Sequence, residues 1–285
     1  MSTTADARLL EALTPRDRDI LDSLARYRLL SSTLIRRLHF SDHHGKDEGA
    51  RATNRIMSRL EKRRLVTRMD QRIGGFQGGS SSLTWQLSTS GHRIHSALTG
   101  LPQRSPLPTS SWLFAMHTLG IAEIAVGLVE AERAGAFEVL SIQTEPACWQ
   151  EFMGPSGALQ RLKPDLYVVT ANAEFEEHSF VEVDLGTEHR PTLQRKAKAY
   201  ARYRASGRHE AQHGVFPRVV WVVRDGRRQK AVEAALAPPV AEAQAQLHLV
   251  TTFDGLPDVL APHPSPEARD HLDHSSRKEE THEQP

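Results

Sequence analysis

The sequence contains one cysteine, Cys148, in 285 residues. No disulfide can therefore form within the chain, which fits a reducing environment such as the cytoplasm. No uninterrupted apolar run approaches the roughly 18 residues of a membrane span, and the N-terminus lacks the basic-then-apolar pattern of a signal peptide. We therefore expect a cytoplasmic protein without a membrane partner, in which the lone thiol is a packing residue rather than a nucleophile.

Net charge is also nearly absent, at +1, but the charges are unevenly distributed. Residues 1–100 carry 17 Lys+Arg and 10 Asp+Glu, a balance of +7. The remainder carries 19 and 25, a balance of −6. The basic N-terminal part predicts a polyanionic partner there, whereas the acidic remainder argues against non-specific coating of nucleic acid by the whole chain.

Proline and serine density marks the boundaries between domains. The stretch GLPQRSPLPTSS predicts a linker, and the polar, aliphatic-poor stretch after residue 262 predicts a disordered tail. The predicted organisation is a first domain at 1–100, a linker at 101–111, a second domain at 112–262 and a tail at 263–285.

The first domain has the element order of a winged helix-turn-helix. Apolar periodicity and capping residues predict helices at about residues 14–29, 31–39 and 48–64. Within residues 66–91, VTRMDQRI and SLTWQLS predict two short strands on either side of the glycine-rich GGFQGGSS. Three helices followed by such a hairpin predict a winged helix, which places its third helix in the major groove of DNA.

The predicted third helix has a polar face that suits DNA. At about 100° per residue, this face holds Arg51, Asn54, Arg55, Ser58, Arg59 and Lys62. Cations suit phosphates, and an amide can pair with a base edge. Arg68 and Arg72 would lie on the wing beside the DNA backbone. An ordinary solvated face, or a winged helix that only contacts proteins, would give the same pattern.

The second domain is predicted to be an α/β domain with a mixed sheet, which makes the chain α+β overall. It begins with a long, mostly apolar helix at 112–134 that contains His117 and Glu123. Predicted strands lie at 137–145, 162–170, 178–186, 217–224 and 247–254, and predicted helices lie at 190–206 and 229–237. Strands adjacent in sequence favour a hairpin, and strands joined by helices favour parallel crossovers.

The stretch FVEVDLGTE places Glu182 and Asp184 on one face of a strand. We expect an antiparallel neighbour that brings Asp165 opposite Asp184 and diagonal to Glu182. Such carboxylates repel one another unless solvent, a cation or protonation relieves them. Mg²⁺ binds carboxylate oxygens and could activate a water there, and Lys196 on the next helix could hold a phosphate oxygen.

Two interpretations of this cluster remain open. In the first, Asp165, Glu182 and Lys196 are catalytic, and Asp165, Glu182 and Asp184 bind Mg²⁺. In the second, the site is degenerate: Asp184 pairs with Lys196 or a nearby arginine, and no metal binds.

The order of Asp165, then Glu182-Val-Asp184, then a helix with Lys196 resembles the PD-(D/E)XK nuclease fold. This sequence departs from that family's pattern, because Asp184 occupies the position of the lysine that follows the acid by two residues. Some members of that superfamily carry the lysine on the following helix, as Lys196 would be.

Most of the chain, roughly residues 10–255, resembles the replication-relaxation family of bacterial plasmids and integrated mobile elements. The resemblance rests on LTPRDRDILDSLARYRLLSSTLIRRLHF, on RLEKRRLV with the wing, on His117, and on EVDLGTE followed by Lys196 and Tyr200. It implies a DNA-binding accessory or initiator protein in plasmid replication and DNA relaxation. Its expected partners are double-stranded DNA, a relaxase or replication protein, and a second copy of the chain.

Two other functions remain open. One is an active Mg²⁺-dependent nickase or endonuclease. The other is a winged-helix transcription regulator whose C-terminal domain dimerises or senses a ligand.

Overall fold

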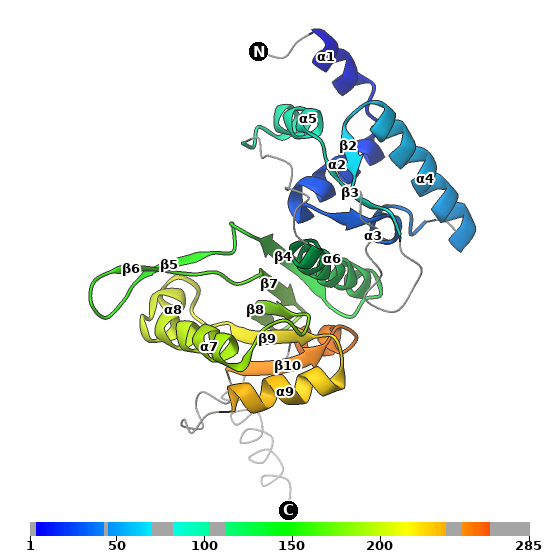
Figure 1. Ribbon diagram of the computed structural model, residues 1–285. Helices are drawn as coiled ribbons and strands as arrows, with labels where there is room; N and C mark the ends of the chain where they lie inside the picture. The colour runs from blue at the N-terminus through cyan, green and yellow to red at the C-terminus, as the bar shows by residue number, and fades with distance from the viewer. Residues whose placement is uncertain (1–3, 43–44, 70–81, 103–111, 238–246, 263–285) are drawn as a thin grey trace, which may run out of the picture.

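The computed structural model describes residues 4–42, 45–69, 82–102, 112–237 and 247–262. Figure 1 shows an N-terminal part at the top, a C-terminal part below it, and helix α6 (Trp112–Arg133) where the two meet. The predicted linker lies outside the described residues except for its first two positions, and the predicted tail lies wholly outside them.

The N-terminal part is mostly helical. Its elements are α1 (Thr4–Glu11), α2 (Pro15–Tyr27), β1 (Leu30–Ser31), α3 (Ser32–His39), α4 (Lys46–Lys62), β2 (Val66–Arg68), β3 (Thr84–Leu87) and α5 (Thr89–Thr99). The strands form an antiparallel sheet in the order β1-β3-β2. The three predicted helices are confirmed as α2, α3 and α4, whereas α1 and β1 were not predicted. The GGFQGGSS segment lies outside the described residues.

Helix α2 begins where its sequence dictates. The Thr14 side chain accepts a hydrogen bond from the backbone N–H of Asp17, and Asp17 accepts one from the backbone N–H of Thr14. This capping box satisfies two amide groups that the first turn leaves without partners, and Pro15 has no N–H to satisfy. Ile20 and Leu24 then face the core, where both are fully buried.

The C-terminal part is built on a five-stranded sheet. Its further elements are β4 (Glu138–Thr144), β5 (Gln150–Met153), β6 (Leu159–Leu162), β7 (Leu166–Ala171), β8 (Glu176–Asp184), α7 (Arg190–Ala205), α8 (Arg208–His213), β9 (Arg218–Val223), α9 (Gly226–Leu236), β10 (His248–Thr252) and α11 (Leu256–Leu260). The sheet order is β10-β9-β8-β7-β4. The pairs β4–β7 and β7–β8 are antiparallel, and β8–β9 and β9–β10 are parallel. The predicted mixed sheet is confirmed; the β5–β6 hairpin, α8 and α11 were not predicted.

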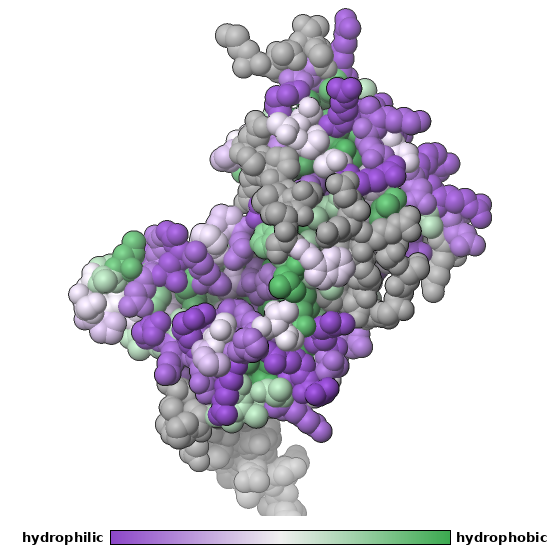
Figure 2. Space-filling view, in the orientation of Figure 1, coloured by the Kyte–Doolittle hydropathy of each residue, from purple (hydrophilic) through white to green (hydrophobic). Residues whose placement is uncertain are grey.

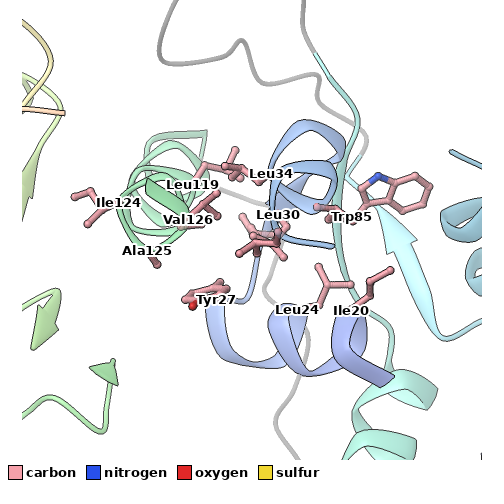
Figure 3. Close-up of a cluster of buried hydrophobic side chains, with 14 of the residues drawn as sticks. Ile20, Leu24, Tyr27, Leu30, Leu34, Trp85, Leu119, Ile124, Ala125 and Val126 are labelled. Atoms are coloured by element: carbon pink, nitrogen blue, oxygen red, sulfur yellow. The ribbon is translucent and has the colours of Figure 1, made fainter. Parts of the chain in front are cut away.

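Helix α6 is buried on two sides. Figure 3 shows its residues Leu119 and Val126 beside Leu30 and Leu34 of the N-terminal part. The same hydrophobic cluster includes sheet residues such as Val181. The layers therefore run from the N-terminal part through α6 to the sheet, and α7 and α9 cover the opposite face of the sheet.

By length and composition alone, α6 could cross a membrane, although its apolar residues do not form one uninterrupted run. Half of its most apolar stretch is buried within the protein. Two of its acidic residues, Glu123 and Glu130, form ion pairs with Arg37 of α3. The apolar side chains of α6 thus pack the two parts of the molecule together, and its carboxylates bind the N-terminal part.

Candidate functional site

The predicted DNA-reading helix is α4, which lies at the outer edge of the N-terminal part (Figure 1). Its Ala52, Met57 and Leu60 are buried, so the predicted amphipathic pattern is confirmed. Figure 2 shows hydrophilic side chains along this edge. We call the polar residues there the α4 face: Arg51, Asn54, Arg55 and Lys62, which are exposed, and Ser58, which is partly exposed.

Arg59 was predicted to belong to this face, but it points toward another helix. Its Nη2 lies 2.6 Å from Oδ1 of Asp17, whose side chain is fully buried. The other Asp17 oxygen accepts the hydrogen bond of the α2 capping box. Arg59 therefore holds α4 against α2, and this role fits its position better than the predicted phosphate contact.

The predicted wing contributes one described cation, Arg68 on β2. Its Nη2 lies 2.5 Å from Oε2 of Glu61, and its guanidinium lies 5.2 Å from the ring centroid of Trp85. The Arg68 side chain is still 45% exposed, so part of its charge faces solvent beside α4. The other predicted wing residue, Arg72, lies outside the described residues.

In the C-terminal part, the predicted strand pairing is wrong by two residues. Strands β7 and β8 pair with Leu166 opposite Val181, so the same register places Asp165 beside Glu182 rather than opposite Asp184. The register follows from a tight turn, in which Asn172 Oδ1 accepts hydrogen bonds from two backbone N–H groups. Because the shift is an even number, the side chains keep their predicted faces.

Asp165 is 6% exposed, and both of its carboxylate oxygens are bonded. Oδ1 lies 3.0 Å from His117 Nε2 on α6, and Oδ2 accepts the backbone N–H of Val183 at 2.7 Å. Burial alone would lower the pKa of His117, but the hydrogen bond and the charge of Asp165 outweigh it, so that pKa is raised. This bond satisfies His117 at the boundary between α6 and the sheet.

Glu182 lies at the centre of the cluster and is 2% exposed. Lys196 Nζ donates to Glu182 Oε2 at 2.8 Å, and the Tyr200 hydroxyl donates to Oε1 at 2.5 Å. Lys196 also forms an ion pair with Glu188 at 2.6 Å. Both donors come from α7 and are four residues apart, which places them on one side of the helix.

Burial, followed by the charge of Asp165, raises the pKa of Glu182 to about 7, although Lys196 and Tyr200 act in the opposite direction. Burial alone would lower the pKa of Lys196, but Glu182 and Asp165 together raise it. Lys196 keeps its charge because it faces these carboxylates and retains contact with solvent. Glu182 is therefore the group of this pair that titrates near neutral pH.

Asp184 closes the cluster at the end of β8 and is 1% exposed. Its Oδ1 accepts the backbone N–H of Gly186 at 2.7 Å, and its Oδ2 accepts Arg228 Nε at 2.9 Å. An arginine partner for Asp184 corresponds to the degenerate-site interpretation. The strand ends here because Gly186, at φ 92°, turns the chain away from the sheet.

The three predicted metal ligands are bonded to protein partners in this arrangement. All six carboxylate oxygens of Asp165, Glu182 and Asp184 already accept hydrogen bonds from the protein. Within the described ranges, no group of three or more His, Cys, Asp or Glu side chains is placed to hold a metal ion. The Mg²⁺ site therefore stays a prediction, and the observed chemistry is that of a buried carboxylate network, which we define as Asp165, Glu182 and Asp184 with their donors His117, Lys196, Tyr200 and Arg228.

Cys148 lies next to this network but has no reactive thiol. It is fully buried, and its Sγ donates to the backbone carbonyl of Pro164 at 3.1 Å. Burial above all raises the pKa of Cys148 to about 12. A thiol that stays protonated is a poor nucleophile, which agrees with a packing role.

The degenerate-site interpretation gave only a nearby arginine as a partner of Asp184, and the structure identifies it as Arg228. Parallel neighbours β8 and β9 end at the same edge of the sheet, and α9 begins directly after β9. Asp225 caps α9 and accepts the backbone N–H of Arg228 at 2.8 Å. A signal for this pair was present in the sequence. Asp225 is an N-cap residue, Arg228 follows in the first turn of α9, and this turn lies at the edge of the sheet where Asp184 ends β8.

Comparison with known families gives a match to replication-relaxation proteins over residues 21–219. The matched region begins within α2 and ends within β9, so it contains α4 and the network residues Asp165, Glu182 and Lys196. It covers well over half of the chain. Neither the curated proteins nor the solved structures that were compared give a match.

Proposed function

The chain belongs to the replication-relaxation family, and from this premise we propose that it binds duplex DNA of a plasmid or integrated mobile element. It acts there as an accessory or initiator protein in replication or DNA relaxation. The observation that carries this proposal is the α4 face, on which Arg51, Asn54 and Arg55 are exposed together.

The order of elements around α4 supports a winged helix-turn-helix. Helices α2, α3 and α4 are followed by β2 and β3, and β1 adds a third strand to the sheet. In that architecture the third helix enters the major groove, and the hairpin lies along the backbone. The exposed cations of α4 would bind phosphates, and Asn54 would contact a base edge.

The C-terminal part serves in this proposal as a rigid support. Its antiparallel β4-β7-β8 unit, followed by a helix and parallel strands, supports a PD-(D/E)XK-like arrangement without requiring its chemistry. Arg133 of α6 donates to the backbone carbonyls of Arg37 and Leu38, at the end of α3. These bonds and the shared core fix the orientation of α4 relative to the sheet.

The test is the affinity for duplex DNA as a function of salt. Arg51→Ala/Arg55→Ala should lower the log–log salt slope by about 2, because each lost phosphate contact lowers it by about 1. Arg227→Ala/Lys230→Ala is the matched control, since it removes two exposed cations from the distant α9. Asn54→Ala should instead relax sequence preference, at a cost of about 1–3 kcal/mol for a bidentate base contact. If Arg51→Ala/Arg55→Ala binds like the control, the proposal is wrong.

A second candidate function is a Mg²⁺-dependent nickase. The observation that favours it is the convergence of Asp165, Glu182 and Lys196, which the register and the Lys196–Glu182 contact bring together. Within the described region, Oε2 of Glu188 also lies buried there without a hydrogen-bond partner. Nicking of supercoiled plasmid by the full chain with Mg²⁺, abolished in Glu182→Ala, would support this function; nicking that persists in the variant would come from a contaminant.

A further inference from the structure

Helix α7 concentrates positive charge in a part of the chain that is otherwise acidic. It contains six Lys and Arg residues and no Asp or Glu. Lys196 points into the buried carboxylate network, whereas Arg195, Lys198 and Arg202 are exposed. We call these three residues the α7 row.

The α7 row lies on the side of the helix that faces away from the sheet. At about 100° per residue, its members fall within about 60° of one another, opposite the buried Leu193 and Tyr200. Arg202 Nε donates to the neutral side chain of Gln160 on β6 at 3.2 Å. Neither Arg195 nor Lys198 forms an ion pair with any residue that the structure describes. Their charges are therefore available to a partner.

We propose that the α7 row binds the phosphate backbone of a second duplex DNA segment, while the α4 face holds the first. Arg202 lies seven positions after Arg195, about 10 Å farther along the helix. Duplex DNA carries one negative charge per about 1.7 Å of its axis, so a row of this length spans several phosphates. This inference rests on the proposed function for the first segment.

The chemistry of the row favours DNA over a membrane or an acidic protein. An interfacial helix inserts an exposed apolar face into lipid, but the large apolar residues of α7, Leu193, Tyr200 and Tyr203, are buried in the core. A protein interface has an apolar centre, and none of the exposed large hydrophobic residues in the described region lies on α7. A straight row of cations without acids or apolar residues suits a regular polyanion.

The positions of the two basic surfaces imply two DNA segments rather than one. The N-terminal part and α6 lie on one face of the sheet, and α7 lies on the other face. Figure 1 places α4 at the upper right of the molecule and α7 in the lower part, and Figure 2 shows hydrophilic side chains over both regions. The sheet and α6 separate the surfaces, so a single straight duplex cannot lie along both of them. The protein would therefore bridge two duplexes.

The experiment is a bridging assay with the full chain, in which a duplex fixed on beads captures a second, fluorescent duplex. Arg195→Ala/Lys198→Ala/Arg202→Ala should reduce capture at least tenfold, whereas its affinity for one short duplex stays within about twofold of the wild type. Arg195→Lys/Arg202→Lys keeps the charge and should capture normally. Arg195→Gln/Lys198→Gln/Arg202→Gln should repeat the alanine result, and an unchanged melting temperature shows that each variant is folded.

Each outcome decides whether the α7 row binds a second duplex. Normal capture by the alanine variant would show that bridging uses two copies of α4, and would overturn the inference. Loss of capture in the lysine variant would overturn it as well, because a phosphate contact needs only the charge. Binding of the wild type to anionic vesicles that the alanine variant loses, with capture intact, would assign the row to a membrane. Arg51→Ala/Arg55→Ala reports separately on the proposed function, through single-duplex affinity.

Discussion

The α4 face and the buried carboxylate network are both dense in charge, but the first is exposed to solvent and the second is buried. On α4, the cations at Arg51 and Arg55 remain in water and keep their charges for a partner. In the network, each carboxylate oxygen of Asp165, Glu182 and Asp184 is withdrawn from water and bonded to the protein. The contrast shows that a motif of charged residues indicates binding only where the fold leaves those charges exposed and unpaired.

The largest effect should come from breaking the Asp184–Arg228 pair. Arg228→Ala leaves a carboxylate that is 1% exposed with only one backbone donor, and an unpaired buried charge costs about 3–5 kcal/mol. We expect urea denaturation to show a loss of stability of that size. Glu138→Ala on β4, which removes an exposed acid, is the control and should change little. Equal stability of the two variants would show that the network is not structural.

The next effect separates two cations of α4 that look alike in the sequence. Arg59→Ala should destabilise the protein by about 1–3 kcal/mol, because it leaves buried Asp17 with only its capping bond. Lys62→Ala, at an exposed position, should leave the unfolding midpoint nearly unchanged and weaken DNA binding instead. The reverse pattern, with Arg59 important for DNA affinity and not for stability, would show that Arg59 belongs to the α4 face.

A smaller effect should appear as a pH dependence of Glu182→Gln. The pKa of Glu182 is raised in the folded state, so the folded protein binds this proton more tightly than the unfolded chain does. The wild type therefore loses stability as pH rises from about 4.5 toward about 7, and the raised pKa of His117 acts in the same direction. Glutamine does not titrate, so stability should shift in favour of the variant by about 1–3 kcal/mol over that range. Urea denaturation at pH 5 and pH 8 measures this shift, and a constant difference between the two proteins would contradict the raised pKa.

The sequence predicted most elements because their signals are local. The capping box at Thr14, the period-two alternation around Glu182 and the apolar stripe of α4 all lie within a few residues of the structure they determine. The pairings of Arg59 with Asp17 and of Arg228 with Asp184 join residues 42 and 44 positions apart, and no local pattern encodes them. The register error had a different, local origin, because the hydrogen bonds of the Asn172 side chain set the turn and the predicted pairing did not take them into account.

The smallest expected effect is the response to metal. It tests most directly whether the buried carboxylate network, unlike the α4 face, is closed to an external ligand. A metal that binds only the folded state raises the melting temperature by mass action. Every oxygen of Asp165, Glu182 and Asp184 has a protein donor, and Lys196 and Arg228 are the cations paired with Glu182 and Asp184. Mg²⁺ would therefore compete with these two side chains for the carboxylates. We therefore expect millimolar Mg²⁺ or Mn²⁺ to leave the wild-type melting temperature unchanged.

Lys196→Met is the positive control for that measurement, because metal is expected to bind this variant. It frees Oε2 of Glu182 and Oε1 of Glu188, both bonded to Lys196 in the wild type, and it leaves Asp165 as an uncompensated neighbour. Hard divalent cations bind such oxygens, so the variant should be less stable without metal and should gain melting temperature with Mn²⁺. A rise in the melting temperature of the wild type that Glu182→Gln abolishes would instead mean that the network opens to admit metal. The nickase would then be the better-supported function of the C-terminal part, ahead of a rigid support for DNA binding.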